Sequence, residues 1–213
     1  MNVAVFDMDG TLVDSEELAF RAAEDGLAEY WERRGEPARI PSRGELRALV
    51  GLPSLEYFAR LVPEERRGDA ALIRELVARR EVDRLKAGEG RLFPAVRETL
   101  AALRARGWKL ALVSNCGHIY FNANLTHLGL GAMVDAAFCL DHHPTKTANV
   151  RAALEAVGGR AGVMVGDRAA DLEAGRANGL RTVGALYGFG TADELAPADA
   201  RIASIAELLE RIA

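Results

Sequence analysis

The chain has 213 residues, of which 49% are hydrophobic and 27% charged, and its formal net charge at pH 7 is -4. This length holds one large domain, or one domain with a small insert, and the composition excludes a disordered chain. There are two cysteines, Cys116 and Cys139, and their number and spacing do not indicate a disulfide framework or a zinc site.

Charge and hydropathy also bear on partners and location. Acids accompany the arginines in pieces such as Arg79-Arg80-Glu81, so we expect this piece to form a solvated helix face and not a nucleic-acid-binding patch. No apolar stretch has the length that spans a bilayer. The apolar run at residues 3–6 is interrupted by Asp7 and is too short for a signal peptide. We therefore expect a cytoplasmic protein with no nucleic-acid or membrane partner.

The first part of the chain predicts one strand followed by helices. The apolar run at residues 3–6 has the length and composition of a buried strand. The region from about residue 15 to residue 91 contains no comparable β-branched run. Helices are predicted there at residues 16–33, 43–50, 54–61 and 69–88. This pattern predicts a mostly helical insert directly after the first strand.

The rest of the chain alternates between strands and helices. A helix is predicted over residues 95–106, after which strands are predicted at residues 110–113, 136–140, 162–165 and 181–185. Helical periodicity between them covers residues 120–128, 150–156 and 169–178. Residues 200–213 predict a short strand and an amphipathic helix that close the sheet edge. The fold class is therefore α/β, a Rossmann-like parallel sheet core formed by residues 1–14 and 92–213 and interrupted by the helical insert, residues 15–91.

Polar residues follow three of the predicted strands. In parallel α/β folds, ligands bind where the carboxyl ends of the strands meet the loops that follow. The residues delivered to this edge are Asp7, Asp9, Gly10 and Thr11 after the first strand, Ser114 and Asn115 after the second, and Asp167 and Asp171 after a third, with Lys146 ahead of a helix. The sequence therefore predicts an acidic site with one lysine at this edge.

Carboxylates that converge in this way repel one another, and a divalent cation relieves the repulsion. Magnesium takes oxygen ligands and typically uses one or two carboxylates together with water and substrate phosphate. We predict Asp7 and Asp167 as direct ligands of Mg²⁺, with Asp9 contributing its backbone carbonyl. An oxygen-rich site also accepts Mn²⁺, so the choice between the two metals stays open.

The same residues suggest phosphoryl transfer. A carboxylate such as that of Asp7 attacks a phosphate once cations and hydrogen-bond donors, here the metal, Lys146 and a serine hydroxyl, neutralise the phosphate charge. Asp9 is placed to protonate the leaving oxygen and later to deprotonate the attacking water. Gly10 permits close approach of the backbone, and Thr11 is able to lock the loop through its hydroxyl.

Four motifs occur in the order and spacing of a known superfamily. They are DMDGTLVDS at residues 7–15, the pair Ser114-Asn115, Lys146, and GDRAAD at residues 166–171. In this respect the chain resembles the haloacid dehalogenase-like hydrolases over nearly its whole length. The helical insert after the first motif, together with residues 50–53 and 183–190, resembles the phosphoglycolate phosphatase and β-phosphoglucomutase branch, in which the insert is a small α-helical cap domain.

The resemblance implies a role for each matching residue. It implies Asp7 as nucleophile and metal ligand, Asp9 as acid/base and metal ligand, Ser114 and Asn115 together with Gly10 and Thr11 as phosphate-binding residues, Lys146 as the charge clamp, Asp167 as a metal ligand, Asp171 as the residue that orients Lys146 or a metal-bound water, and Gly51 as part of a cap loop that faces the site. A carboxylic acid at Asp9 favours phosphate esters over halides and phosphonates. One departure is Thr147, since relatives usually carry proline after the lysine.

We therefore expect a Mg²⁺-dependent phosphatase that acts on a small phosphorylated metabolite through an aspartyl-phosphate, with phosphoglycolate as the leading substrate. Two other enzymes fit the same motifs: a phosphomutase of the β-phosphoglucomutase kind and a pyrophosphatase. A non-catalytic phosphate-binding protein is the alternative outside enzymes. The expected partner is a small phosphate ester, and the sequence leaves open whether the chain is a monomer or a homodimer.

Overall fold

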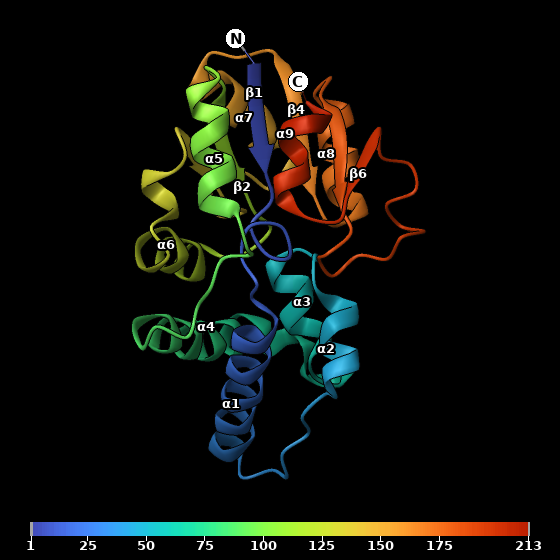
Figure 1. Cartoon of the computed structure of the whole chain (residues 1–213). Coiled ribbons are helices and arrows are strands. Elements are labelled where there is room, and N and C mark those ends of the chain that lie inside the picture. Colours follow the sequence, from blue (N-terminus) through green and yellow to red (C-terminus); the bar gives the residue numbers. More distant parts are fainter. Residues whose placement is uncertain (1, 213) are drawn as a thin grey trace.

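The computed structural model describes residues 2–212, which form a parallel sheet with helices on both faces and a further layer of helices beyond the carboxyl ends of the strands (Figure 1). The sheet has six strands in the order β3-β2-β1-β4-β5-β6, and every neighbouring pair is parallel. This is the Rossmann order, with β1 at the centre. The strands are β1 (Asn2–Phe6), β2 (Lys109–Val113), β3 (Ala136–Phe138), β4 (Ala161–Gly166), β5 (Arg181–Ala185) and β6 (Ala200–Ile202).

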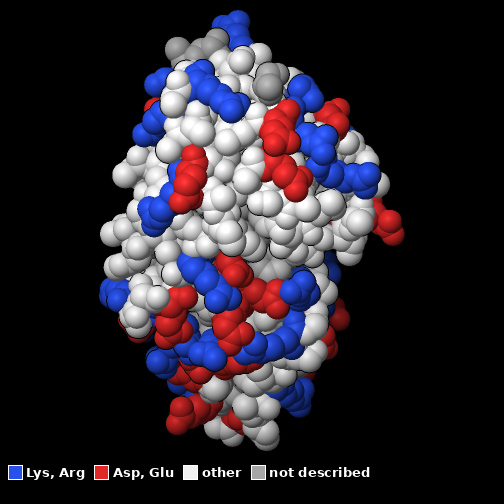
Figure 2. Space-filling view, in the orientation of Figure 1, with Lys and Arg blue, Asp and Glu red and all other residues white. Residues whose placement is uncertain are grey.

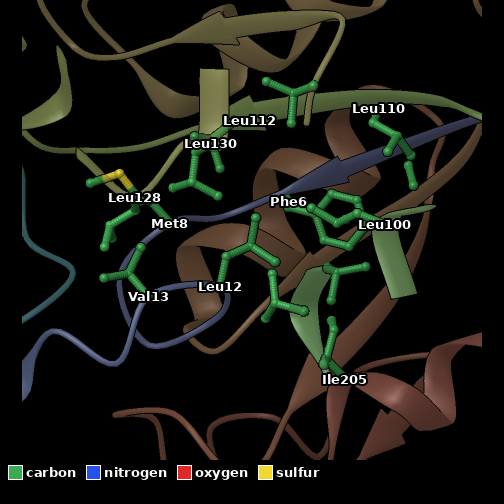
Figure 3. Close-up of a cluster of buried hydrophobic side chains, with 14 of the residues drawn as sticks. Phe6, Met8, Leu12, Val13, Leu100, Leu110, Leu112, Leu128, Leu130 and Ile205 are labelled. Atoms are coloured by element: carbon green, nitrogen blue, oxygen red, sulfur yellow. The ribbon is translucent and has the colours of Figure 1, made fainter. Parts of the chain in front are cut away.

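The strands are buried on both faces, and successive residues point to opposite sides. Val3 and Val5 of β1 belong to one hydrophobic cluster, to which α7 (Lys146–Val157) and α8 (Ala169–Ala177) contribute. Ala4 and Phe6 belong to a second cluster on the other face. That cluster includes residues of α5 (Val96–Ala105), α6 (His118–His127) and α9 (Leu208–Arg211). Figure 3 shows Phe6 of β1 near Leu12 and Leu100 in this second cluster.

The helical layer consists of four α-helices with a core of their own. They are α1 (Glu16–Arg34), α2 (Arg43–Leu49), α3 (Ser54–Arg60) and α4 (Ala70–Lys86), with the 3-10 helix η1 (Glu64–Asp69) between α3 and α4. Their hydrophobic cluster is distinct from the two clusters of the sheet and includes Phe20, Leu27, Trp31, Ile73 and Leu76. The predicted α/β fold with inserted helices is thereby confirmed.

Helices α1 and α4 approach each other closely. Gly26 of α1 faces Val77 of α4, and a Cβ atom at Gly26 would lie 2.9 Å from backbone atoms of Val77. Real Cβ atoms do not approach other heavy atoms so closely, so only glycine permits this crossing. The crossing therefore sets the rotation of α4 about its own axis, and with it which side chains of α4 face the sheet.

The chain enters and leaves the helical layer at neighbouring points. The backbone amide of Asp14 donates to the carbonyl of Arg91 (3.0 Å), and the amide of Phe93 donates to the carbonyl of Leu12 (3.0 Å). Val13 and Leu92 form an antiparallel bridge between these two hydrogen bonds. We call this pairing of residues 12–14 with residues 91–93 the connecting ribbon. The chain just before the helical layer and the chain just after it are thus hydrogen-bonded to each other.

Charged side chains on the helical layer alternate in sign. Figure 2 shows Lys and Arg interspersed with Asp and Glu over the lower half of the viewed face, which the helical layer occupies. The expectation of a solvated helix face holds for Arg79 and Arg80, which are exposed, but is wrong for Glu81, which is buried. A helix turns by about 100° per residue, so neighbours in sequence face different directions. Within residues 2–212, no helix is long and apolar enough to cross a membrane.

Candidate active site

The strand order explains why the predicted site residues meet. β1 lies between β2 and β4, and Asp7, Ser114 and Asp167 directly follow these three strands. All three side chains are buried. The amide of Asp7 also continues the ladder to β4 by donating to the carbonyl of Val165 (2.9 Å). The two acids and the serine therefore lie at the same edge of the sheet, as the sequence predicts.

Lys146 lies between two of the acids. It begins helix α7 and is buried, and its Nζ donates to Oδ1 of Asp7 (2.6 Å) and to Oδ1 of Asp171 (2.5 Å). Burial alone lowers the pKa of Lys146, but the attraction of Asp171 and Asp7 outweighs burial and raises that pKa above its ordinary value. The ammonium is therefore charged and held against the carboxylate of Asp7.

The loop after β1 is fixed against Asp167. The hydroxyl of Thr11 donates to Oδ1 of Asp167 (3.0 Å), and the amide of Phe189 donates to Oδ2 (2.7 Å). Gly10 adopts φ +79°, and a Cβ atom there would lie 2.3 Å from Oδ2 of Asp167. The close approach expected at Gly10 and the hydroxyl contact expected at Thr11 are thus both made with the side chain of Asp167.

The acids at this edge carry more negative charge than Lys146 balances. Asp7, Asp167 and Asp171 each offer an oxygen atom, and these atoms lie within 4.8 Å of one another. Burial and then repulsion from Asp171 raise the pKa of Asp7 well above its ordinary value, and the same two causes raise the pKa of Asp167 to about 7. An all-oxygen donor set with excess negative charge fits Mg²⁺.

Asp171 is less available to a metal than its two neighbours. Its Oδ1 accepts from Lys146, and its Oδ2 accepts from the amide of Arg168 (2.9 Å). It lies in the first turn of α8, where a negative charge also interacts favourably with the helix dipole. The resemblance implies that Asp171 orients either Lys146 or a metal-bound water, and these contacts match the first of the two roles.

Asp9 lies outside the cluster of Asp7, Asp167 and Asp171. Its Oδ1 accepts a hydrogen bond from the hydroxyl of Tyr120 on α6 (2.8 Å). Burial raises the pKa of Asp9, although the hydrogen bond from Tyr120 opposes this shift. The side chain of Asp9 is therefore held apart from the oxygens of this acid cluster, and a contribution to a metal site through its backbone carbonyl stays a prediction.

Asn115 connects the sheet edge to the helical layer. Its Nδ2 donates to the carbonyl of Gly51 (3.0 Å), and its own carbonyl accepts from the amide of Ser54 (3.2 Å). Gly51 has φ +95°, which favours glycine in this loop. The predicted phosphate-binding residue Asn115 and the predicted cap residue Gly51 thus contact each other. The hydroxyl of Ser114 accepts from the amide of Cys116 (3.2 Å).

A cavity of about 410 Å³ lies at this edge, between the sheet and the helical layer. The core lines it with Asp7, Asp9, Ser114, Asn115 and Lys146. The helical layer lines it with residues that the sequence analysis did not select, among them Tyr57, Arg74 and Glu81. One signal for Glu81 is present in the sequence, because its neighbours at i-4 and i+4 on α4 are the buried Val77 and Leu85.

Comparisons with known proteins agree with this architecture. The family model for haloacid dehalogenase-like hydrolases matches residues 1–179, and the chain belongs to this family. It is 29% identical over 210 residues to the probable phosphatase IndB of Dickeya dadantii, covering 94% of this chain and 87% of that protein. It is 30% identical over 196 residues to the phosphoglycolate phosphatase of Aquifex aeolicus, covering 89% of this chain and 86% of that protein.

A solved structure is also similar. The crystal structure of a predicted phosphatase from Clostridium acetobutylicum superposes with a TM-score of 0.78 and 26% identity, covering 99% of this chain and 97% of that one. The predicted family, its phosphoglycolate phosphatase-like branch and the enzyme class, a haloacid dehalogenase-like phosphatase, are thereby confirmed.

Proposed function

We propose that the protein hydrolyses a small phosphate monoester through an aspartyl-phosphate on Asp7, with Mg²⁺ as cofactor. The observation that carries this proposal is the carboxylate of Asp7, which is buried, lines the cavity and is held 2.6 Å from the ammonium of Lys146. Phosphoglycolate, the substrate in the name of the Aquifex aeolicus relative, is the first candidate.

In the first step, an oxygen of Asp7 forms a bond to phosphorus and the bond from phosphorus to the leaving oxygen breaks. Lys146 and the hydroxyl of Ser114 stabilise the negative charge on the phosphoryl oxygens. Asp7 and Asp167 would hold Mg²⁺, which when bound supplies further charge neutralisation to the phosphate. The hydrogen bonds from Thr11 and Phe189 hold Asp167 in place for this purpose.

Asp9 carries the proton in both steps of the proposed reaction. It protonates the leaving oxygen as the first bond breaks, and it later accepts a proton from the water that attacks the aspartyl-phosphate. Asp9 lines the cavity beside Asp7, and Tyr120 fixes its carboxyl group by the 2.8 Å hydrogen bond. Tyr120 is therefore proposed as a positioning residue for the acid/base.

We further propose that residues 15–91 form a cap domain over a core formed by residues 1–14 and 92–213. Few polar contacts join the two across the cavity, among them those of Asn115 with Gly51 and of Arg168 with the carbonyl of Val50. We propose that these polar contacts break and re-form, so that the cap opens for exchange and closes to exclude water. The cytoplasmic location and the small-molecule partner belong to this proposal.

The test is release of free phosphate from phosphoglycolate, pyrophosphate, sugar phosphates and p-nitrophenyl phosphate, measured with Mg²⁺ or with EDTA. The native protein is compared with Asp7→Asn and with the control Asp193→Asn, which removes an exposed acid. We expect release that needs both metal and Asp7, and mass spectrometry of the quenched reaction is expected to find the phosphoryl group on the peptide that contains Asp7.

Two results would contradict the proposal. If Asp7→Asn releases phosphate as fast as the native protein, Asp7 is not the nucleophile. If the native protein releases no phosphate but interconverts sugar phosphates, the enzyme is a phosphomutase. A phosphomutase passes the phosphoryl group to a sugar hydroxyl, so the two enzymes differ in whether free phosphate appears without a sugar acceptor.

A further inference from the structure

Glu81 on α4 is a buried acid that none of the roles described above uses. Its side chain is 8% exposed and lines the cavity. Within residues 2–212, no basic group lies within the 4.0 Å that defines an ion pair with Glu81, and its carboxyl makes no hydrogen bond to another side chain or to the backbone. The neighbouring acid on the same helix, Glu75, pairs instead with Arg79.

The position of Glu81 follows from the period of the helix. The cavity is lined by Arg74, Ala78 and Glu81 of α4, which are spaced by four and three residues and therefore share one face. Arg79 and Arg80 lie on the exposed side. Because the crossing with α1 fixes α4, the carboxyl of Glu81 is directed toward the cavity and not toward bulk solvent.

The environment of Glu81 disfavours the charged form of its carboxyl group. Burial, and then repulsion from Asp9, raise the pKa of Glu81 well above its ordinary value. Buried polar groups in native proteins are nearly always hydrogen-bonded, and those that are not point to a missing partner or to a function. A strongly perturbed acid that lines a cavity is a candidate for a functional role.

We infer that Glu81 accepts a hydrogen bond from a hydroxyl group of the substrate's leaving alcohol, so that the preferred substrates are phosphate esters of polyols or sugars. This inference rests on the proposed function, narrows its substrate class and places polyol and sugar phosphates ahead of phosphoglycolate among the candidate substrates. Glu81 faces the same cavity as Asp9, which meets the leaving oxygen, so a group attached to that oxygen extends toward the cap. A hydroxyl group satisfies a carboxyl in either protonation state, because both forms retain an acceptor oxygen.

A carboxylate on the leaving group fits this wall of the cavity less well. It would bring a negative charge into the buried wall beside Asp9 and Glu81, and burial disfavours a charge that has no cation beside it. The cation on the same face of α4, Arg74, already pairs with Asp141 (3.5 Å). The cavity volume of about 410 Å³ is also within the range of pockets that hold ligands much larger than a two-carbon acid. The site therefore favours a hydroxylated leaving group over that of phosphoglycolate.

The test compares kcat/KM of the native protein, Glu81→Leu and Glu81→Gln for glycerol phosphate, glucose 6-phosphate, phosphoglycolate and p-nitrophenyl phosphate. A hydrogen bond to a charged group corresponds to roughly 10-fold to 100-fold in kcat/KM. We expect Glu81→Leu to lose that factor on the two hydroxylated substrates alone. Glu81→Gln keeps an acceptor and is expected to retain most of the activity. The control Asp83→Asn removes an exposed acid of the same helix and is expected to change nothing.

Unfolding in urea provides a second readout. Glu81→Leu replaces an unpaired buried carboxyl by an apolar group, so we expect a higher midpoint of unfolding together with the lost selectivity. If the ratio of kcat/KM between hydroxylated substrates and phosphoglycolate is the same in the native protein and in Glu81→Leu, the inference is overturned while the proposed function stands. If the native protein hydrolyses no substrate in the panel, the proposed function fails and the inference with it.

Discussion

Replacement of Lys146 by methionine tests the electrostatics of the site directly. The side chain of Lys146 is buried between Asp7 and Asp171, at 2.6 and 2.5 Å. Methionine has a similar length and shape but carries no charge. The variant therefore leaves two buried carboxylates without their cation, in a site that already holds the acid of Asp167.

The size of the expected loss of stability in Lys146→Met follows from the burial of the three side chains. Lys146 is 8% exposed, Asp7 5% and Asp171 0%, so solvent screens their interaction little. Removal of one partner from a buried pair typically costs about 3–5 kcal/mol. For a chain of this length each kcal/mol lowers the melting temperature by about 2–4 °C. We therefore expect Lys146→Met to melt roughly 6–20 °C below the native protein.

Thermal unfolding at pH 7 in EDTA measures this effect without a metal ion. The exposed Lys86→Met is the control and is expected to melt with the native protein. In the double variant Lys146→Met/Asp171→Asn, one of the two unpaired acids is gone, so we expect it to melt above Lys146→Met alone. A drop of less than about 2 °C in Lys146→Met, or a double variant that is no more stable, would refute the reasoning.

Two further predictions concern the helical layer and the proposed acid/base, Asp9. Gly26→Ala places a Cβ atom 2.9 Å from the backbone of Val77, so we expect a loss of about 1–3 kcal/mol in urea unfolding. Gly44→Ala, with 4.0 Å to its nearest neighbour, is the control and should gain stability, and equal values for both would contradict the close crossing. Tyr120→Phe removes the 2.8 Å hydrogen bond to Asp9. We expect kcat to fall roughly 10-fold to 100-fold with little change in KM. An unchanged kcat would show that Tyr120 does not position Asp9.

The residues at the strand ends could be predicted from the sequence because their position depends on two things only. These are the short apolar runs that form the strands and the rule that parallel strands end at one edge of the sheet. Asp7, Ser114 and Asp167 each follow an apolar run that had to be a buried strand. Parallel strands bring their carboxyl ends to one edge, so the three residues meet once the runs are assigned. No knowledge of side-chain packing is needed for that step.

The cap side of the cavity could not be predicted in the same way. Glu81 lies in a charged piece of sequence, and its burial depends on the crossing of α1 and α4 at Gly26 and Val77. Tyr120 reaches Asp9 from α6, which is far away in the sequence. Such contacts follow from how helices pack on one another, and local propensity carries little information about packing.

The connecting ribbon has a mechanical consequence for the site. Backbone hydrogen bonds tie residues 12–14 to residues 91–93, so the two crossings between the layers cannot slide past each other without breaking those bonds. Bending and twisting about this strip are the displacements that leave the hydrogen bonds of the ribbon intact. The strip begins at the loop of Asp9, which itself bridges to Val13. A tilt of the helical layer about this strip would therefore also move the loop of Asp9, the proposed acid/base, so that the angle of the proposed cap and the position of that carboxyl would change together.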